Sequence, residues 1–281
     1  MAAGSVDVLF RGIVDYAGTF PPARLNIAGA EAEYARYRAG QHDWLVGTFV
    51  VAADHLTQLD PATVPLSVVI GDTAPAALDR LWNGAAAAAI RAVEFMPAPP
   101  SLITELAAAV PKRIQAFFEV PAGDDMSRRL DAIAACGAAA KIRTGGLTPD
   151  AFPRAQAVDA FLRGCNDRGV AAKATAGLHH ALAGDYPFTY EPQSASGAMF
   201  GFLNISAAAA LVHAGRPPKD VIEVLREPSA DAFLFDEDGM EWRGDRITIK
   251  QLRTMRETLF RSFGSCSLRE PVDDLKRMRL L

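Results

Sequence analysis

Short apolar runs alternate with longer segments of helical spacing along most of the chain. Each run has the length of a strand, and most are stopped by glycine, proline or a charged residue. This alternation is typical of a parallel sheet built from βαβ units. The sequence predicts seven strands, at 8–14, 44–51, 65–70, 90–96 and 113–120, and in the two runs that reach Lys141 and Lys173.

The segments between these runs predict helices. Ser101 is a suitable N-cap for a helix that extends to residue 110, and Asp124 or Asp125 for a helix that extends to Cys136. Further helical spacing is found at 28–38, 74–82, 149–168, 203–213, 219–225 and 249–261.

The last hundred residues follow a less regular pattern. Residues 182–198 are rich in Pro, Gly and Ser and predict a long loop over the strand ends, a kind of loop that is often functional. Residues 231–243 predict a hairpin with Asp238-Gly239 at its turn. The eighth strand is either 232–235 or the run around Phe263, and the sequence does not decide between them.

Two architectures fit a parallel sheet of this kind, a closed barrel and an open doubly wound sheet. The open sheet should carry a GxGxxG or GxxxxGK[ST] phosphate fingerprint after its first strand, and neither motif occurs. We therefore predict an α/β fold, a (β/α)8 TIM barrel with a long loop after strand 7 and an inserted C-terminal hairpin. One barrel domain would span 1–281, with an elaborated insertion at 182–248.

Length, composition and charge narrow the classes of protein. The 281 residues suit one such barrel, and half of them are hydrophobic. The formal net charge of −4 argues against nucleic acid as a partner. The sequence shows neither an apolar run of membrane-spanning length nor a secretory leader, and its three scattered cysteines favour a reducing compartment. We expect a cytoplasmic protein with no membrane partner.

The clearest chemical signal is a pair of lysine motifs on either side of one helix-sized segment. The first reads Lys141-Ile-Arg-Thr-Gly and the second reads Lys173-Ala-Thr-Ala-Gly. In a βαβ unit both lysines lie at the same end of the sheet, where α/β folds keep their chemistry. Because side chains alternate along a strand, Lys141 shares a face with Arg143, and Lys173 shares one with Thr175.

This arrangement predicts lysine chemistry. Neighbouring cations and apolar walls both lower the pKa of a lysine. A lysine with a lowered pKa can attack a carbonyl group and form a Schiff base, an electron sink that allows an adjacent C–C bond to break or form. The reaction needs a proton shuttle, and Asp15, Glu94 and Glu119 are the candidate carboxylates.

The two motifs resemble those of the deoxyribose-phosphate aldolase family, class I aldolases with a (β/α)8 barrel. Lys141, Thr144 and Gly145 match that family's sixth-strand motif, and Lys173 and Gly177 match its seventh-strand motif. The resemblance implies that Lys141 forms the imine and that Lys173 perturbs it.

The resemblance extends to other strand ends. It implies an aspartate on the first strand, like Asp15, a proton-handling acid on the fourth, for which Glu94 is a loose match, and a glutamate at the end of the fifth, like Glu119. The run 263–267 is similar to the family's phosphate-binding loop, which implicates Gly264 and Ser265.

The sequence also departs from that family. Arg143 replaces a small residue beside the imine lysine, and His179-His180 replace a hydrophobic-Arg-Thr continuation. The segment between Lys173 and Gly264 is far longer, which requires an insertion. The planar fork of an arginine suits a carboxylate or a phosphate, so a keto acid or a sugar acid is a candidate substrate.

We predict a class I lyase, aldolase-like, that forms a Schiff base between a lysine and a small anionic carbonyl substrate, without a cofactor or a bound metal. The predicted catalytic residues are Lys141, Lys173, Glu94 and Asp15, and the predicted substrate-binding residues are Arg143, Glu119, Thr175, His179, His180, Gly264 and Ser265.

Other interpretations stay open. Both lysines could be buried salt-bridge partners of Glu94 and Glu119. The barrel could lack imine chemistry and act as a metal- or carboxylate-assisted isomerase or hydrolase, with His179-His180 and Asp15 or Glu119 as metal ligands. It could also bind a small anion without catalysis. The sequence does not determine the oligomeric state, and a homo-oligomer is one of the alternatives.

Overall fold

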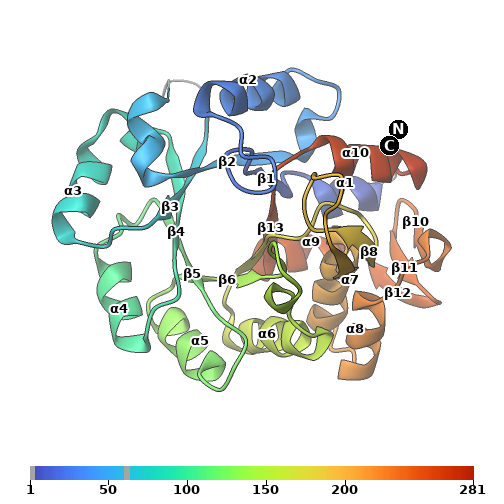
Figure 1. The fold of residues 1–281 in the computed structure, drawn as a ribbon. Helices are drawn as coiled ribbons and strands as arrows, with labels where there is room; N and C mark the ends of the chain where they lie inside the picture. The colour runs from blue at the N-terminus through green and yellow to red at the C-terminus, as the bar shows by residue number, and fades with distance from the viewer. Residues whose placement is uncertain (1–3, 60–63) are drawn as a thin grey trace.

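A computed structural model describes residues 4–59 and 64–281, and a closed barrel of eight parallel strands lies at its centre (Figure 1). The strands follow one another around the barrel in the order β1-β13-β7-β6-β5-β4-β3-β2. This arrangement confirms the predicted (β/α)8 barrel. The strands are β1 (Val14–Tyr16), β2 (Val46–Ala52), β3 (Leu66–Ile70), β4 (Ile90–Phe95), β5 (Gln115–Glu119), β6 (Ala139–Arg143), β7 (Ala172–Thr175) and β13 (Phe260–Ser265).

Helices surround the barrel, and most of them lie where helical spacing predicts them (Figure 1). They are α2 (Ile27–Arg38), α3 (Pro75–Asn83), α4 (Pro100–Ala108), α5 (Met126–Ala135), α6 (Ala155–Arg168), α7 (Phe202–His213), α8 (Pro218–Leu225), α9 (Ile249–Thr258) and α10 (Arg269–Arg277). Short 3-10 turns precede or join some of these elements, at Asp43–Leu45, Ala53–Gln58, Ala85–Ala88, Pro149–Ala151 and Ala230–Ala232.

Two predicted helix caps differ from the structure. Ser101 lies inside α4, which starts at Pro100 with Pro99 in the cap position. Proline suits this first position because it has no N–H to satisfy and its φ is already helical. Asp125 does occupy the cap position of α5, but its side chain makes no capping hydrogen bond. A complete capping box is found at the start of another helix, α9, where it is formed by Thr248 and Gln251.

The predicted strand at 8–14 is wrong, because residues Gly4–Phe10 form a helix, α1. Val6, Leu9 and Phe10 are buried together on one face of this helix, which packs against α9 and against β11 (Gly239–Trp242). The first barrel strand begins only at Val14. A short apolar run fits either state, and here tertiary packing favours the helix.

The eighth barrel strand is β13. Of the two candidate runs, the one around Phe263 is therefore the barrel strand. The competing run forms β10 (Phe233–Phe235), which pairs with β11 and β12 (Asp245–Thr248) in a separate antiparallel sheet. The predicted hairpin at 231–243 is therefore confirmed and gains a third strand. The predicted loop at 182–198 contains a second small hairpin, β8 (Gly184–Pro187) with β9 (Ser196–Met199).

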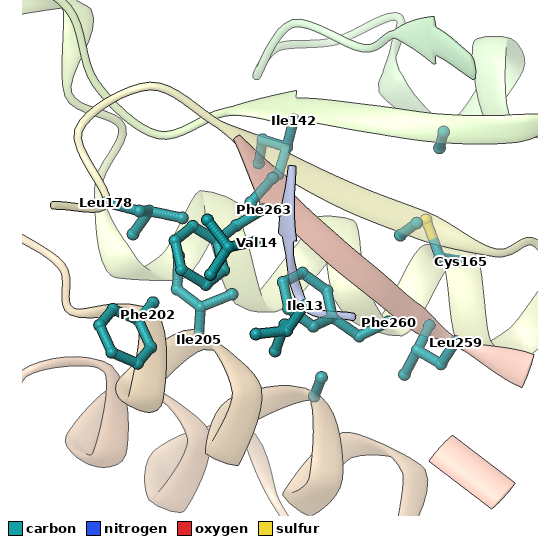
Figure 2. Packing of buried hydrophobic residues seen from close by; sticks show 14 of the residues in the cluster. Ile13, Val14, Ile142, Cys165, Leu178, Phe202, Ile205, Leu259, Phe260 and Phe263 are labelled. Atoms are coloured by element: carbon teal, nitrogen blue, oxygen red, sulfur yellow. The ribbon is translucent and has the colours of Figure 1, made fainter. Parts of the chain in front are cut away.

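Helix α7 is buried along nearly all of its length and links the barrel to the outer helices. Its side chains from Phe202 to Val212 are all buried, as expected for a helix with apolar residues on nearly every face. The ring of Phe202 stacks on Phe263 of β13 with centroids 5.0 Å apart, and Figure 2 shows Ile205 and Leu178 beside this pair. This packing fixes β13 and the loop after β7, which carry part of the candidate site.

Candidate functional site

Two lysines and three carboxylates meet at the carboxyl ends of the barrel strands. The parallel register pairs Lys141 on β6 with Lys173 on β7 and with Glu119 on β5. Lys141 Nζ lies 3.3 Å from Glu94 Oε2 and 3.2 Å from Glu119 Oε2. Lys173 Nζ lies 2.5 Å from Asp15 Oδ2 and 2.8 Å from Glu94 Oε1. The structure thus brings all four predicted catalytic residues, and Glu119, into one buried network.

Glu94 lies between the two lysines and joins them. Its Oε1 also accepts a hydrogen bond of 2.7 Å from Ser67 Oγ on the neighbouring strand β3. The network forms because β3 to β7 are consecutive neighbours around the barrel and each contributes one residue to it.

Asp15 is held by hydroxyl groups from the strands on both sides of β1. Its Oδ1 accepts hydrogen bonds from the backbone N–H and the hydroxyl of Thr48, and its Oδ2 accepts one of 2.6 Å from Ser262 Oγ. These bonds, together with Lys173, account for both carboxylate oxygens. Asp15 is therefore fixed in place as the partner of Lys173.

The electrostatics of the network differ from the expectation of a purely cationic cluster. Burial opposes the charged form of Glu94, but Lys173 and Lys141 outweigh it and lower the pKa of this carboxyl to about 2. Burial likewise opposes the charge of Lys173, but Asp15 and Glu94 outweigh it and raise the lysine pKa. The expectation that cationic neighbours lower the pKa of this lysine is wrong, because carboxylates stand between the cations.

A cavity of about 450 Å³ opens at this end of the barrel, and Lys141 is the lysine that lines it. Glu94, Arg143 and Thr175 also line it, whereas Lys173, Asp15 and Glu119 do not. The volume lies within the range of small-molecule sites. Lys141 and Lys173 therefore differ in position as well as in partners.

Arg143 lies on the rim of the cavity. Its side chain is 46% exposed, and its Nε lies 3.3 Å from Glu119 Oε1. Glu119 is thus shared between Lys141 and Arg143. Nη1 and Nη2 of Arg143 make no hydrogen bond to any other residue within 4–59 and 64–281, so they can bind an incoming anion.

The two adjacent histidines have different surroundings. His179 lines the cavity, and its Nδ1 lies 3.7 Å from Cys266 Sγ and 3.9 Å from Glu270 Oε2. His180 does not line this cavity; its Nδ1 lies 3.1 Å from Asp274 Oδ2, and its ring stacks on Tyr186. The predicted contribution of His179 to the site thus has a geometric basis that His180 lacks.

The histidine and carboxylate set considered for a metal is not assembled. Asp15 and Glu119 face the lysines, and His180 is paired with Asp274 on α10. Within the described part of the chain, no group of three or more His, Cys, Asp or Glu side chains has the arrangement of a metal site.

The loop after β13 is closed on itself. Gly264 lines the cavity, but Ser265 is 2% exposed and its hydroxyl donates to the backbone oxygen of Ser267. The N–H of Ser267 donates back to Ser265 Oγ, and the N–H of Arg269 donates to Ser267 Oγ. Of the two residues predicted here, only Gly264 reaches the cavity.

Close contact between two loops shapes one side of the cavity. A Cβ added at Gly145 would lie 2.7 Å from the Cα of Gly177, so the loops after β6 and β7 can only meet at glycines. Thr144 supports the same contact, because its hydroxyl donates to the backbone oxygen of Ala176 at 2.7 Å. The glycines that follow the lysine motifs therefore position the cavity-lining residues.

Several site residues were missed from the sequence. Ser67, Thr48 and Ser262 bond the carboxylates, and Cys266 lines the cavity beside His179. The apolar wall was also missed, and it consists of Phe20, Pro21, Pro22, Val50, Val69, Met96, Leu147, Phe188 and Met199. The alternation of side chains along a strand could have placed Ser67 and Ser262 on the same face as the site residues. The loop residues of the cavity wall have no such pattern in the sequence.

Comparison with protein-family models found no match, and comparison with curated protein sequences found no similar protein. The proposed chemistry therefore rests on the geometry of the site. Among the described residues, no helix is both long and apolar enough to cross a membrane.

Proposed function

We propose that the protein is a class I lyase, aldolase-like, in which Lys141 forms a Schiff base with a small anionic carbonyl compound. The observation that carries this proposal is the position of Lys141. It lines the cavity at the carboxyl end of the barrel, whereas Lys173 lies outside the cavity lining and is bonded to Asp15 and Glu94.

The contacts of Lys141 are looser than those of Lys173. Its two carboxylate partners lie at 3.2 and 3.3 Å, longer than those of Lys173. Glu119 Oε2 accepts no hydrogen bond from any described residue, so its contact with Lys141 is an ionic one without hydrogen-bond alignment. Lys141 is therefore held less tightly than Lys173.

The reaction would begin with the neutral amine of Lys141. Its nitrogen attacks the carbonyl carbon. The carbonyl oxygen then leaves as water with two protons, one from the attacking nitrogen and one that the ammonium form of Lys141 had released to solvent, which gives the protonated imine. Lys173 keeps its charge and holds Glu94 and Asp15 in place. Glu94 is a weak base because its pKa is about 2, so we assign it a role in positioning Lys141 and stabilising the charged imine.

Borohydride reduction of the imine tests this proposal. We expect the intact protein to gain the mass of one reduced adduct after incubation with a panel of oxo acids and aldehydes. Lys141→Met should abolish the gain, and Lys219→Met, at a side chain that is 81% exposed on α8, should leave it unchanged. If the wild-type protein forms no adduct with any compound of the panel, the proposal fails.

A second candidate is a barrel that binds a small anion without imine chemistry. The ion pairs favour it, because each lysine contacts two carboxylates, as a structural network would. This candidate predicts ligand binding without any trapped adduct. The same borohydride experiment, combined with a binding measurement, separates the two.

A further inference from the structure

We propose that the cavity takes an oxo acid with an apolar body, and that it does not take a sugar phosphate. This inference rests on the proposed function for the place of the carbonyl group, beside Lys141. The rest follows from three features of the cavity: its wall, the free face of Arg143 and the loop after β13.

The wall is largely apolar. Phe20, Pro21 and Pro22 come from the loop after β1, and Phe188 and Met199 come from the β8–β9 hairpin region. Met96 and Leu147 are 47% and 40% exposed, so the apolar surface continues to the rim. A sugar needs hydrogen-bond partners for each hydroxyl, and this wall offers none, whereas an alkyl or aryl group is stabilised by burial here.

Arg143 supplies the place for the carboxylate. It lies two positions after Lys141 on the same face of β6, so the Cα atoms of the two residues are about 7 Å apart along the strand. The ammonium and guanidinium groups therefore extend from neighbouring positions on one face. An oxo acid places its carboxylate close to its carbonyl carbon. Both groups of one small molecule can therefore be held together, with the fork of Arg143 on the carboxylate.

The loop after β13 argues against phosphate. The hydroxyls of Ser265 and Ser267 and the N–H groups of Ser267 and Arg269 are bonded within the loop itself. Glu270 lies 3.9 Å from His179 and would repel a second anion at this end of the cavity. A phosphate dianion at this end would lie near a negative side chain, and neither serine hydroxyl of this loop lines the cavity.

Four probes separate these contributions. Binding of 4-methyl-2-oxopentanoate, pyruvate, 4-methyl-2-pentanone and glyceraldehyde 3-phosphate is measured by calorimetry on the full-length protein, and each is then trapped with borohydride. We expect the branched oxo acid to bind most tightly, because it alone combines the carboxylate with the apolar body. Pyruvate lacks the body and the ketone lacks the carboxylate, so each should bind at least several-fold more weakly.

Two variants assign the contacts. Arg143→Gln should weaken the branched oxo acid about tenfold or more and leave the ketone unchanged. Leu147→Gln should weaken the branched oxo acid several-fold and leave pyruvate unchanged. Leu234→Gln is the matched control, since Leu234 is 58% exposed on β10 and does not line the cavity.

The outcomes distinguish this inference from the proposed function. Tighter binding of glyceraldehyde 3-phosphate than of the oxo acids, or no effect of Arg143→Gln, overturns the inference even if Lys141 is trapped. Binding of the branched oxo acid with the expected dependence on Arg143 and Leu147, but without an adduct, supports the inference and overturns the imine. Failure of both oxo acids to bind overturns the inference.

Discussion

Lys141 and Lys173 are register partners on neighbouring strands, yet only Lys141 lines the cavity. Lys173 lies on the other side of Glu94, within 2.8 Å of two carboxylates. The shared carboxylate couples the two lysines and gives them different environments. In the proposed mechanism Lys141 reacts with the ligand, and Lys173 balances the charge of Asp15 and Glu94.

Removal of Lys173 should destabilise the protein strongly. Lys173→Met leaves Asp15 and Glu94 buried without their common cation, and loss of one partner of a buried pair costs about 3–5 kcal/mol. The measurement is the free energy of unfolding in urea at neutral pH. Lys173→Met combined with Glu94→Gln should recover part of the loss. An unchanged unfolding midpoint in the single variant would contradict the proposed network.

Acid should destabilise the protein through Glu94. Its pKa of about 2 lies below its ordinary value of 4.5, so its ion pairs contribute stability that is complete above about pH 4.5 and is lost as the pH falls toward 2. We expect the unfolding temperature to fall across this range, and less steeply in Glu94→Gln. Equal slopes for the two proteins would count against the assigned role of Glu94.

Alkaline pH should affect the stability of the protein through Lys173, the ion-pair partner of Glu94. Because the pKa of Lys173 is raised above its ordinary value of 10.5, its contribution to stability is present below pH 10.5 and is lost only as the pH rises beyond that value. The contribution of Lys173 to the unfolding temperature should therefore stay constant up to about pH 10.

The glycine contact between the loops after β6 and β7 should tolerate no side chain. Gly145→Ala places a Cβ 2.7 Å from the Cα of Gly177, and overpacking of this kind costs about 1–3 kcal/mol. Gly71→Ala is the control, because a Cβ there meets nothing within 4 Å. Thermal unfolding should show a clear loss in the first variant and none in the second.

His179 should carry the proton in the reaction. It lines the cavity with Lys141, and burial lowers its pKa from the usual 6.5, an effect that Glu270 opposes and His180 strengthens. A neutral imidazole accepts protons, so solvent exchange at the carbon beside the imine should accelerate as the pH rises through this lowered pKa. Exchange of 4-methyl-2-oxopentanoate in D₂O, followed by NMR, measures it. His179→Gln should slow exchange and leave borohydride trapping intact; loss of trapping would instead indicate a role in binding.

Much of the barrel was predictable because apolar runs of strand length repeat along the chain. Glu94, Glu119, Lys141 and Lys173 were found for the same reason, since each stands at or near the end of such a run. The first strand was misplaced because α1 and a strand have the same local composition. The eighth strand was not decided by the sequence because Phe233–Phe235 is a short apolar run, whereas Phe260–Ser265 mixes two phenylalanines with polar residues. Only tertiary packing places the second run in the barrel.

The different environments of the two lysines were not predictable. Each motif shows a lysine at a strand end, and nothing local shows that Glu94 and Asp15 enclose Lys173. The apolar wall comes from loops such as the one that contains Phe20, whose position depends on the closed barrel. Alternation along a strand did place Arg143 beside Lys141, and the structure agrees.

The most direct test of the central claim is to locate the adduct. After borohydride reduction with 4-methyl-2-oxopentanoate, peptide mass spectrometry identifies which lysine carries the added mass. We predict that the modified residue is Lys141 and that Lys173 is unmodified. An adduct on Lys173, or on neither lysine, would contradict the account.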